Sequence, residues 1–232
     1  MENTSGRAMS ERVLVVSVHP DDETLGCGGT VLKHVADGLE VHWAVVTQAY
    51  EPEWSREVIN RKSEEVDQVA KAYSISSLTR LGFPANGLAD IKLGEIIESL
   101  RTLILEVRPG TVYLVNGQDI HTDHRVVFDA VTVVIKPFHM RKLGIRRILT
   151  YETISSTDAA PPEPGRQFVP HVFSDITSFI NRKIEIMQLY ATEIQPEPLP
   201  RSPSAIRALA RVRGATIGVE YAEAFSVIKE II

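Results

Sequence analysis

Short apolar runs of strand length alternate with segments of helical periodicity along this chain, and this alternation limits the possible folds more than any other feature. Residues 12–18 (RVLVVSV) and 41–47 (VHWAVVT) are apolar at consecutive positions, as in strands that are buried on both faces. Between them, residues 30–38 have helical spacing and end at Gly38, a common helix terminator. The pattern predicts an α/β fold class, with a parallel sheet covered by helices.

The same alternation continues to the C-terminus. Helices are predicted at 55–73, 93–110, 124–135, 178–193 and around 205–214, and strands at 77–83, 111–116, 146–155, 171–177 and near 225–232. The proline-rich stretches 156–170 and 195–203 are interpreted as surface loops. We therefore expect one domain over residues 12–232, preceded by a disordered segment at residues 1–11.

Charge and cysteine content narrow the classes of function. The chain has 25 basic and 30 acidic residues, a net charge of -5, and no Lys/Arg block of the kind that binds nucleic acid. Its single cysteine excludes an intramolecular disulfide framework and a cysteine-rich zinc site, so any metal must be held by His, Asp or Glu. The sequence shows neither a signal peptide nor a run of about 18 apolar residues. We expect a cytoplasmic protein with no nucleic-acid partner and no membrane span.

Two polar loops are dense in groups that bind metals. Residues 19–29 (HPDDETLGCGG) follow the first predicted strand, and residues 119–124 (DIHTDH) follow the predicted strand at 111–116. The carboxyl ends of parallel strands meet at one edge of a sheet, and ligands bind there. We therefore predict a single site built from both loops.

The glycines of the first loop have a different explanation. The spacing of Gly26, Gly28 and Gly29 is not GxGxxG, and these residues come after the predicted helix start rather than before it. A nucleotide-binding loop is therefore disfavoured. We predict that the glycines allow close packing of the helix on the sheet.

The residue types of the two loops match a catalytic zinc site. Such a site takes three protein ligands and leaves a position for water, and two histidines with one carboxylate form a known set. We predict His19, Asp22 and His124 as the ligands. Bound zinc lowers the pKa of its water to about 7. Asp21, which is not a ligand, can then act as the general base.

His121 and Asp123 complete the predicted site, although simpler interpretations exist. His121 is predicted to stabilise an oxyanion as its imidazolium, with Asp123 orienting it. Together these groups are the parts of a metal-dependent amidase or esterase. Alternatively, Asp21 and Asp22 are only acidic residues at a helix start, Asp123 is an N-cap, and His121 and His124 are an ordinary surface pair.

The two loops together resemble the paired signature of the LmbE-like (PIG-L) zinc-dependent de-N-acetylases. The resemblance extends in the same order through RKSE (61–64), LGFPANGL (81–88), YETISST (151–157), PRS (200–202) and GVEYAEAF (218–225). It implies a Rossmann-like, three-layer α/β/α fold with a mostly parallel sheet. It also implies one Zn²⁺ ion bound by His19, Asp22 and His124, with Asp21 as the general base and with His121 and its partner Asp123 stabilising the intermediate. Fe²⁺ or another divalent metal stays open as the cofactor. Relatives are often homo-oligomers, and the oligomeric state of this protein also stays open.

Four further residues are candidates for contact with the substrate. Arg61 matches an arginine that lies near the substrate in some relatives, but it can equally be a solvated charge on a helix. Arg201 has the same two interpretations. Residues 47–57 (TQAYEPEWSRE) depart from the family, in which many relatives have a flexible loop with glycine. Here Tyr50 and Trp54 either stack on a sugar ring or cover the edge of the sheet.

The resemblance implies a hydrolase that cleaves the acetamide of a small N-acetylglucosamine-type sugar or sugar conjugate, releasing the free amine and acetate. One alternative is a non-catalytic sugar or nucleotide-sugar binding protein on the same scaffold. A second is an iron(II) oxygenase with two histidines and one carboxylate. The predicted alternation of strands and helices argues against the oxygenase, because such enzymes usually have antiparallel barrels.

Overall fold

Seven strands form one sheet in the computed structural model, which describes residues 11–163, 165 and 167–232. Their order across the sheet is β3-β2-β1-β4-β5-β7-β6. The strands are β1 (Arg12–Ser17), β2 (Glu40–Gln48), β3 (Ser77–Pro84), β4 (Thr111–Val115), β5 (Arg147–Tyr151), β6 (Val172–Asp175) and β7 (Ala222–Glu230). Strands β1 to β5 are parallel, whereas β7 is antiparallel to both β5 and β6. The predicted mostly parallel sheet is confirmed. Of the predicted disordered segment, residues 1–10 lie outside the described residues.

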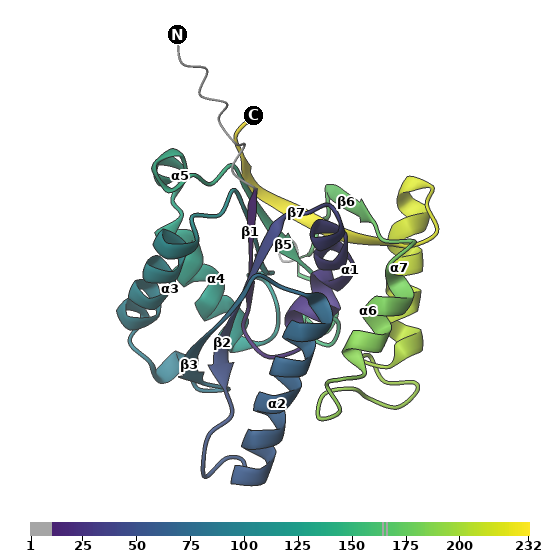
Figure 1. Ribbon diagram of the computed structural model, residues 1–232, viewed down its shortest axis with the longest axis horizontal. Coiled ribbons are helices and arrows are strands. Elements are labelled where there is room, and N and C mark those ends of the chain that lie inside the picture. The colour runs from purple at the N-terminus through teal and green to yellow at the C-terminus, as the bar shows by residue number, and fades with distance from the viewer. Residues whose placement is uncertain (1–10, 164, 166) are drawn as a thin grey trace.

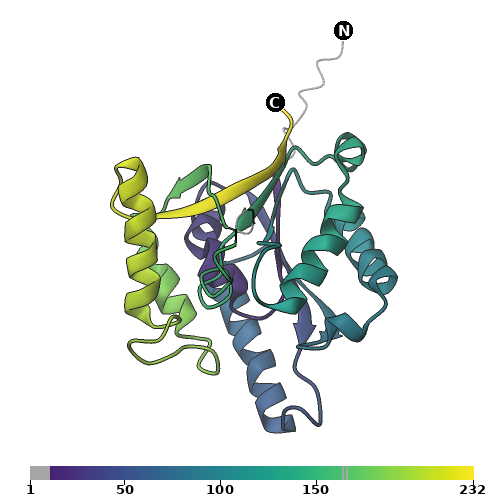
Figure 2. The same cartoon turned by 180° about the vertical axis from the view of Figure 1, so that it is seen from behind.

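Helices cover both faces of this sheet (Figure 1). One layer contains α1 (Asp22–Ala36), α2 (Arg56–Tyr73), α6 (Ile180–Met187) and α7 (Pro203–Ile217). The other contains α3 (Leu93–Val107), α4 (Thr122–Val134) and the short α5 (Pro137–Leu143), with the 3-10 turn η1 (Leu88–Asp90). Figure 2 shows the two layers from behind. The three-layer arrangement is therefore confirmed. Within the described part of the chain, no helix has the length and apolar character needed to cross a bilayer.

The central strands are buried because helices pack on both of their faces. In β1, Val13, Leu14, Val15 and Val16 are at most 1% exposed, and every residue of β4 is buried. The edge strands β3 and β6 are only partly buried. This difference explains why the central strands have continuous apolar runs instead of an alternating pattern.

Helix α1 begins at Asp22, where the acidic residues after the first strand predicted a helix start, and it continues through most of the segment 30–38 that has helical spacing. The backbone at Cys27 is not helical (φ -141°, ψ 18°), so a kink divides the helix into two parts. The carboxylate of Glu223 accepts the N–H groups of Gly29 and Thr30 at 2.8 and 2.7 Å and thereby caps the second part. These bonds come from a residue almost two hundred positions away, so local periodicity could not reveal how the second part is capped.

Two other helices differ from the prediction at their ends. Pro137 was expected only to stop a helix, but it opens α5 at the first helical position, where a missing N–H costs nothing. Helix α6 ends at Met187, shorter than the predicted 178–193, and turns follow it.

Close packing of the α1 glycines against neighbouring side chains is confirmed. A Cβ atom on Gly26 would lie 2.0 Å from Cδ2 of Tyr151, and one on Gly29 would lie 2.7 Å from Cγ2 of Ile176. The Tyr151 ring is held in place, because its hydroxyl donates to the Val16 carbonyl at 2.9 Å. Helix α1 therefore approaches the sheet only because these positions lack side chains.

Gly26→Ala is expected to destabilise the protein by about 1–3 kcal/mol, because the added methyl group overpacks a fixed aromatic ring. Urea unfolding followed by circular dichroism measures the change. The matched control is Gly94→Ala in α3, where a Cβ atom meets nothing within 4 Å. That change should be neutral or stabilise by up to about 1 kcal/mol. Equal effects of the two substitutions would contradict the packing argument.

The strand order reverses direction between β1 and β4, which are neighbours in the sheet. Helix α1 leaves β1 toward one face, and α4 follows β4 on the other (Figure 1). The loops at the carboxyl ends of these two strands therefore separate and leave a crevice, the usual ligand position in such sheets. Both loops singled out in the sequence lie at this point.

Candidate metal centre

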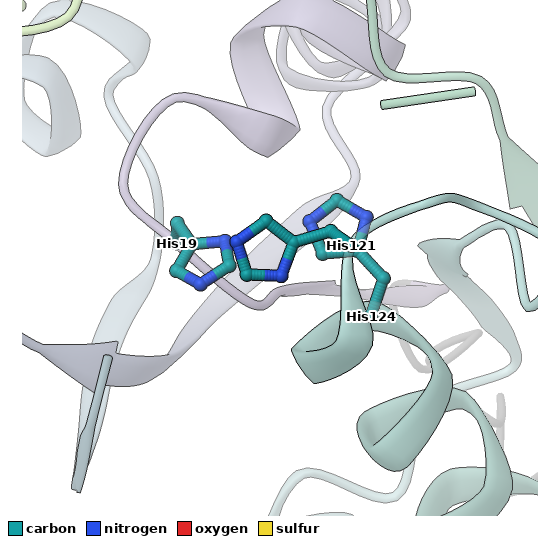
Figure 3. A group of neighbouring side chains, drawn as sticks. All are labelled: His19, His121 and His124. Atoms are coloured by element: carbon teal, nitrogen blue, oxygen red, sulfur yellow. The ribbon is translucent and has the colours of Figure 1, made fainter. Parts of the chain in front are cut away.

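Three histidines meet at the crevice between β1 and β4. His19 follows β1, while His121 is the N-cap of α4 and His124 lies in its first turn. One ring nitrogen from each lies within 4.8 Å of the others. Figure 3 shows the three rings side by side, with His121 and His124 coming from the same helix start. The fold therefore brings together the histidines of the two loops.

Asp22 lies between two of these histidines. Its Oδ1 atom is 3.4 Å from His124 Nε2, and its Oδ2 atom is 3.8 Å from His19 Nδ1. Oδ2 also accepts the N–H groups of Val18 and His19 at 2.9 and 2.8 Å. Burial opposes ionisation of Asp22, but His124 and His19 hold its pKa below the usual range for a carboxyl. A fixed negative charge therefore faces both rings.

A second carboxylate supports each of these two histidines from behind. Asp119 Oδ2 lies 2.8 Å from His124 Nδ1, and Asp123 Oδ2 lies 3.1 Å from His19 Nε2. A carboxylate on the far nitrogen is typical of metal-binding histidines, because it fixes the ring and its tautomer. His121 has no such hydrogen bond in the described residues, since its Nδ1 accepts a backbone N–H instead. His19 and His124 therefore have the stronger character of metal ligands.

The donor set fits a divalent cation. Ligand bonds of about 2.0–2.2 Å place neighbouring ligands of a tetrahedral zinc ion roughly 3.3 Å apart. The distances from Asp22 to His124 and His19, 3.4 and 3.8 Å, are close to that value. Burial opposes a proton on His124, yet Asp22 and Asp119 raise its pKa to about 10. The surroundings of His124 therefore favour a positive charge, and a metal ion would supply it after displacing that proton.

Asp119 was not recognised as a site residue from the sequence. It is fully buried, and Asn116 Nδ2 donates to its Oδ1 at 3.1 Å. The available signal was its position at the start of DIHTDH, five residues before His124. A carboxylate in the loop before a histidine pair is also common without any metal, so the signal was weak.

Asp119→Asn is expected to lower zinc affinity about 10–100-fold, the usual effect of losing a carboxylate behind a metal-binding histidine. Competition with a chromophoric chelator measures the affinity. Asp129→Asn is the matched control, because Asp129 is exposed on the same helix as His124. If both variants bind zinc equally well, Asp119 does not support the centre.

Asp21 lies beside the metal-binding groups without joining them. It is 4% exposed, and its carboxylate accepts a hydrogen bond from Arg201 Nη1 at 3.0 Å. Burial raises the pKa of Asp21, the charges of Asp22 and Glu193 raise it further, and Arg201 opposes them. A carboxyl whose pKa moves toward neutrality suits a general base. Its φ of 108° is also costly for a residue other than glycine, and such strain gathers at functional sites.

Asp123 has a different partner from the one expected. The sequence predicted that the Asp123 carboxylate orients His121. In the structure its carboxylate instead contacts His19 and accepts the N–H groups of Asn86 and Leu88 at 2.7 and 3.2 Å. Only its backbone N–H contacts His121, at Nδ1. The loop after β3 brings these amides to the carboxylate, and sequence spacing cannot show that approach.

His121 also differs from the predicted imidazolium. Burial lowers its pKa to about 4, and the nearby rings of His19 and His124 contribute. His121 is therefore neutral near neutral pH. Because Nδ1 accepts the Asp123 N–H, the ring proton is on Nε2. His121 can then stabilise a developing negative charge as a neutral hydrogen-bond donor.

A cavity of about 760 Å³ opens over the centre. The predicted site residues that line it are His19, Asp21, Asp22, Trp54, His121, His124 and Arg201. Tyr50 and Arg61 do not line it. Tyr50 packs edge-on against Trp54, with ring centroids 5.9 Å apart. Arg61 is 60% exposed and lies 3.4 Å from Glu65, whereas its neighbour Lys62 faces the cavity. Successive positions on α2 are rotated about the helix axis, and here Lys62 rather than Arg61 lies on the side of the cavity.

Residues 14–135 match the family described as PIG-L, GlcNAc-PI de-N-acetylase. The match covers just over half of the chain and includes both site loops. The chain belongs to this family. Among individual relatives, it is 26% identical over 217 residues to 2'-N-acetylparomamine deacetylase of Streptomyces fradiae, covering 80% of this chain and 75% of that protein.

Solved structures share the fold along nearly the whole chain. The conserved protein TT1542 from Thermus thermophilus superposes with a TM-score of 0.75 at 26% identity, covering 97% of each chain. GalB, the 4-carboxy-2-hydroxymuconate hydratase of Pseudomonas putida KT2440, gives a TM-score of 0.74 at 18% identity, covering 96% of this chain and 98% of that one. Because the same fold occurs in a protein named as a hydratase, the activity must be argued from the site itself.

Proposed function

We propose that this protein is a metal-dependent de-N-acetylase that hydrolyses the acetamide of an N-acetylglucosamine-type sugar or sugar conjugate. The observation that carries the proposal is the buried Asp21, with its raised pKa, beside two carboxylate-supported histidines and Asp22 in one cavity. Membership of the PIG-L family supports this reaction over hydration, and so does the name of the Streptomyces fradiae relative.

His19, Asp22 and His124 are the residues that we assign to the metal, with zinc as the ion. Asp22 supplies the negative charge. The rings of His19 and His124 are each held by a further carboxylate. Once bound, such an ion polarises the amide carbonyl and lowers the pKa of a water molecule. His121 lies beside these ligands and stays free to contact the substrate.

The remaining residues move and hold protons. Asp21 takes a proton from the attacking water, and its raised pKa makes it an effective acceptor. The neutral His121 donates its Nε2–H to the carbonyl oxygen as negative charge develops there. Asp21 then gives its proton to the leaving amine, and acetate departs. Arg201 holds the Asp21 carboxylate in place throughout.

Residues 12–232 are proposed to act as one catalytic domain in the cytoplasm. The domain assignment is supported by the single sheet, which takes strands from β1 to β7. The compartment is supported by the low cysteine content of the chain.

The decisive experiment is a substrate panel with chelated and zinc-reloaded protein. We expect acetate and free amine to appear in equal amounts from at least one N-acetyl sugar, to vanish with the chelator and to return with zinc. Binding of an N-acetyl sugar without acetate release would favour the non-catalytic alternative. Oxygen consumption with iron(II) would favour the oxygenase. Either result would remove the proposed function.

A further inference from the structure

The cavity extends well beyond the metal centre. Its volume of about 760 Å³ lies in the upper part of the range of roughly 300–1,000 Å³ that holds drug-sized ligands. The polar end, beside the histidines, includes Asn86, Ser155 and Ser156, which suit the hydroxyl groups of a sugar. An N-acetyl sugar at that end leaves the remainder of the cavity for another part of the substrate.

The remainder has an apolar wall. Val58, Lys62 and Val66 line the cavity because they follow one another at intervals of four along α2 and so share a face, and the polar residues Asn60 and Ser63 of the same helix line it too. The apolar side chains of the wall are Leu25, Val45, Trp54, Val58, Ile59 and Val66. Leu25, Val45 and Val66 are only 2–3% exposed and form its floor, whereas the others are half-buried. The floor of the wall reaches the metal centre at Leu25, which lies one turn from Asp22 on α1.

The charges in the cavity do not suit a phosphate group. Every lysine and arginine among the described lining residues already has a carboxylate partner: Lys62 pairs with Glu193, Arg80 with Asp67, and Arg201 with Asp21 and Glu193. Phosphate sites usually offer an arginine or lysine whose donors are free to bind the anion. A phosphate here would compete with these carboxylates for the cations and would face Asp21, Asp22 and Glu193. Arg201 Nε is buried and has no hydrogen-bond partner among the described residues, so one donor of the paired cations remains unused.

We propose that the substrate is an N-acetylglucosaminide with an uncharged apolar aglycone, an alkyl or aryl group that lies against α2 between Trp54 and Val66. This inference rests on the proposed deacetylation and adds the class of the group attached to the sugar. The position of the apolar side chains of α2 and Leu25 next to the metal centre gives the position of the aglycone, and the carboxylate partners of the cations disfavour a nucleoside diphosphate in the same place.

The test compares three substrates with the zinc-loaded full-length protein: the methyl and hexyl glycosides of N-acetylglucosamine, and uridine diphosphate N-acetylglucosamine. Each buried methylene group favours binding about threefold to fourfold. We expect kcat/KM for the hexyl glycoside to exceed that for the methyl glycoside by at least about tenfold, mostly through KM. The nucleotide sugar should not exceed the methyl glycoside.

Variants of the wall make the test specific. Ile59→Asn places an amide on the half-buried face of α2, so the ratio of hexyl to methyl kcat/KM should fall about tenfold. Leu105→Asn is the control, since Leu105 is 53% exposed on α3 and does not line the cavity. That variant should keep both the ratio and the activity.

Three results distinguish a failure of the inferred aglycone from a failure of the proposed deacetylase function. Equal kcat/KM for the hexyl and methyl glycosides, with acetate released from both, would overturn the apolar aglycone and leave the deacetylase intact. Preference for the nucleotide sugar would do the same and point to a phosphate-bearing substrate. No acetate from any N-acetyl glycoside would overturn the proposed function and the inference together.

Discussion

Asp21→Asn is expected to lower kcat for acetate release by about 10²–10⁴-fold, the contribution of a positioned general base. Asparagine has nearly the same shape, can still accept the Arg201 hydrogen bond, and tolerates the positive φ of this position better than alanine does. The loss should therefore reflect proton transfer rather than a changed fold. Initial rates of acetate release at saturating substrate measure it.

Zinc content distinguishes Asp21 from its neighbour. Asp21→Asn should keep stoichiometric zinc, whereas Asp22→Asn should lose zinc affinity, because only Asp22 faces both His19 and His124. Asp37→Asn, at the exposed C-cap of the same helix, is the control and should keep both zinc and activity. Undiminished turnover in Asp21→Asn would remove Asp21 as the base.

Lys183→Met is expected to destabilise the protein by about 3–5 kcal/mol, the usual cost of leaving one charge of a buried ion pair without its partner. Lys183 and Glu223 are each 3% exposed, and Lys183 Nζ lies 2.8 Å from both Glu223 Oε1 and the Leu25 carbonyl. The variant leaves the Glu223 carboxylate without a cationic partner beside the kink in α1. Urea unfolding at constant pH measures the change.

Arg182→Met is the matched control, since Arg182 is the preceding residue of the same helix and pairs with Glu185 in solvent. An exposed pair of this kind contributes at most about 1 kcal/mol. The double variant Lys183→Met/Glu223→Gln should recover part of the lost stability, because no unpaired charge remains. Equal losses in the Lys183 and Arg182 variants would refute a special role for the buried pair.

Side-chain direction explains why only some of the predicted substrate residues line the cavity. Motif matching selected Arg61, but the helical repeat turns Arg61 to solvent and Lys62 to the cavity. Arg201 does line the cavity, yet its guanidinium binds the carboxylates of Asp21 and Glu193. In both cases the sequence identified the neighbourhood, whereas the direction and partner of the side chain depend on packing.

The sequence by itself determined the parallel sheet and the meeting of the two loops, because buried strands need continuous apolar runs and parallel strands end at one edge. Only the tertiary structure decided that Asp119 and Asp123 stand behind His124 and His19, and that Asp21 binds Arg201 from a distant loop. It also placed Glu223 on the kink of α1. Apolar periodicity reports which face of an element is buried. Hydrogen bonds between distant segments produce no periodic pattern in the sequence, so their partners are known only from the folded structure.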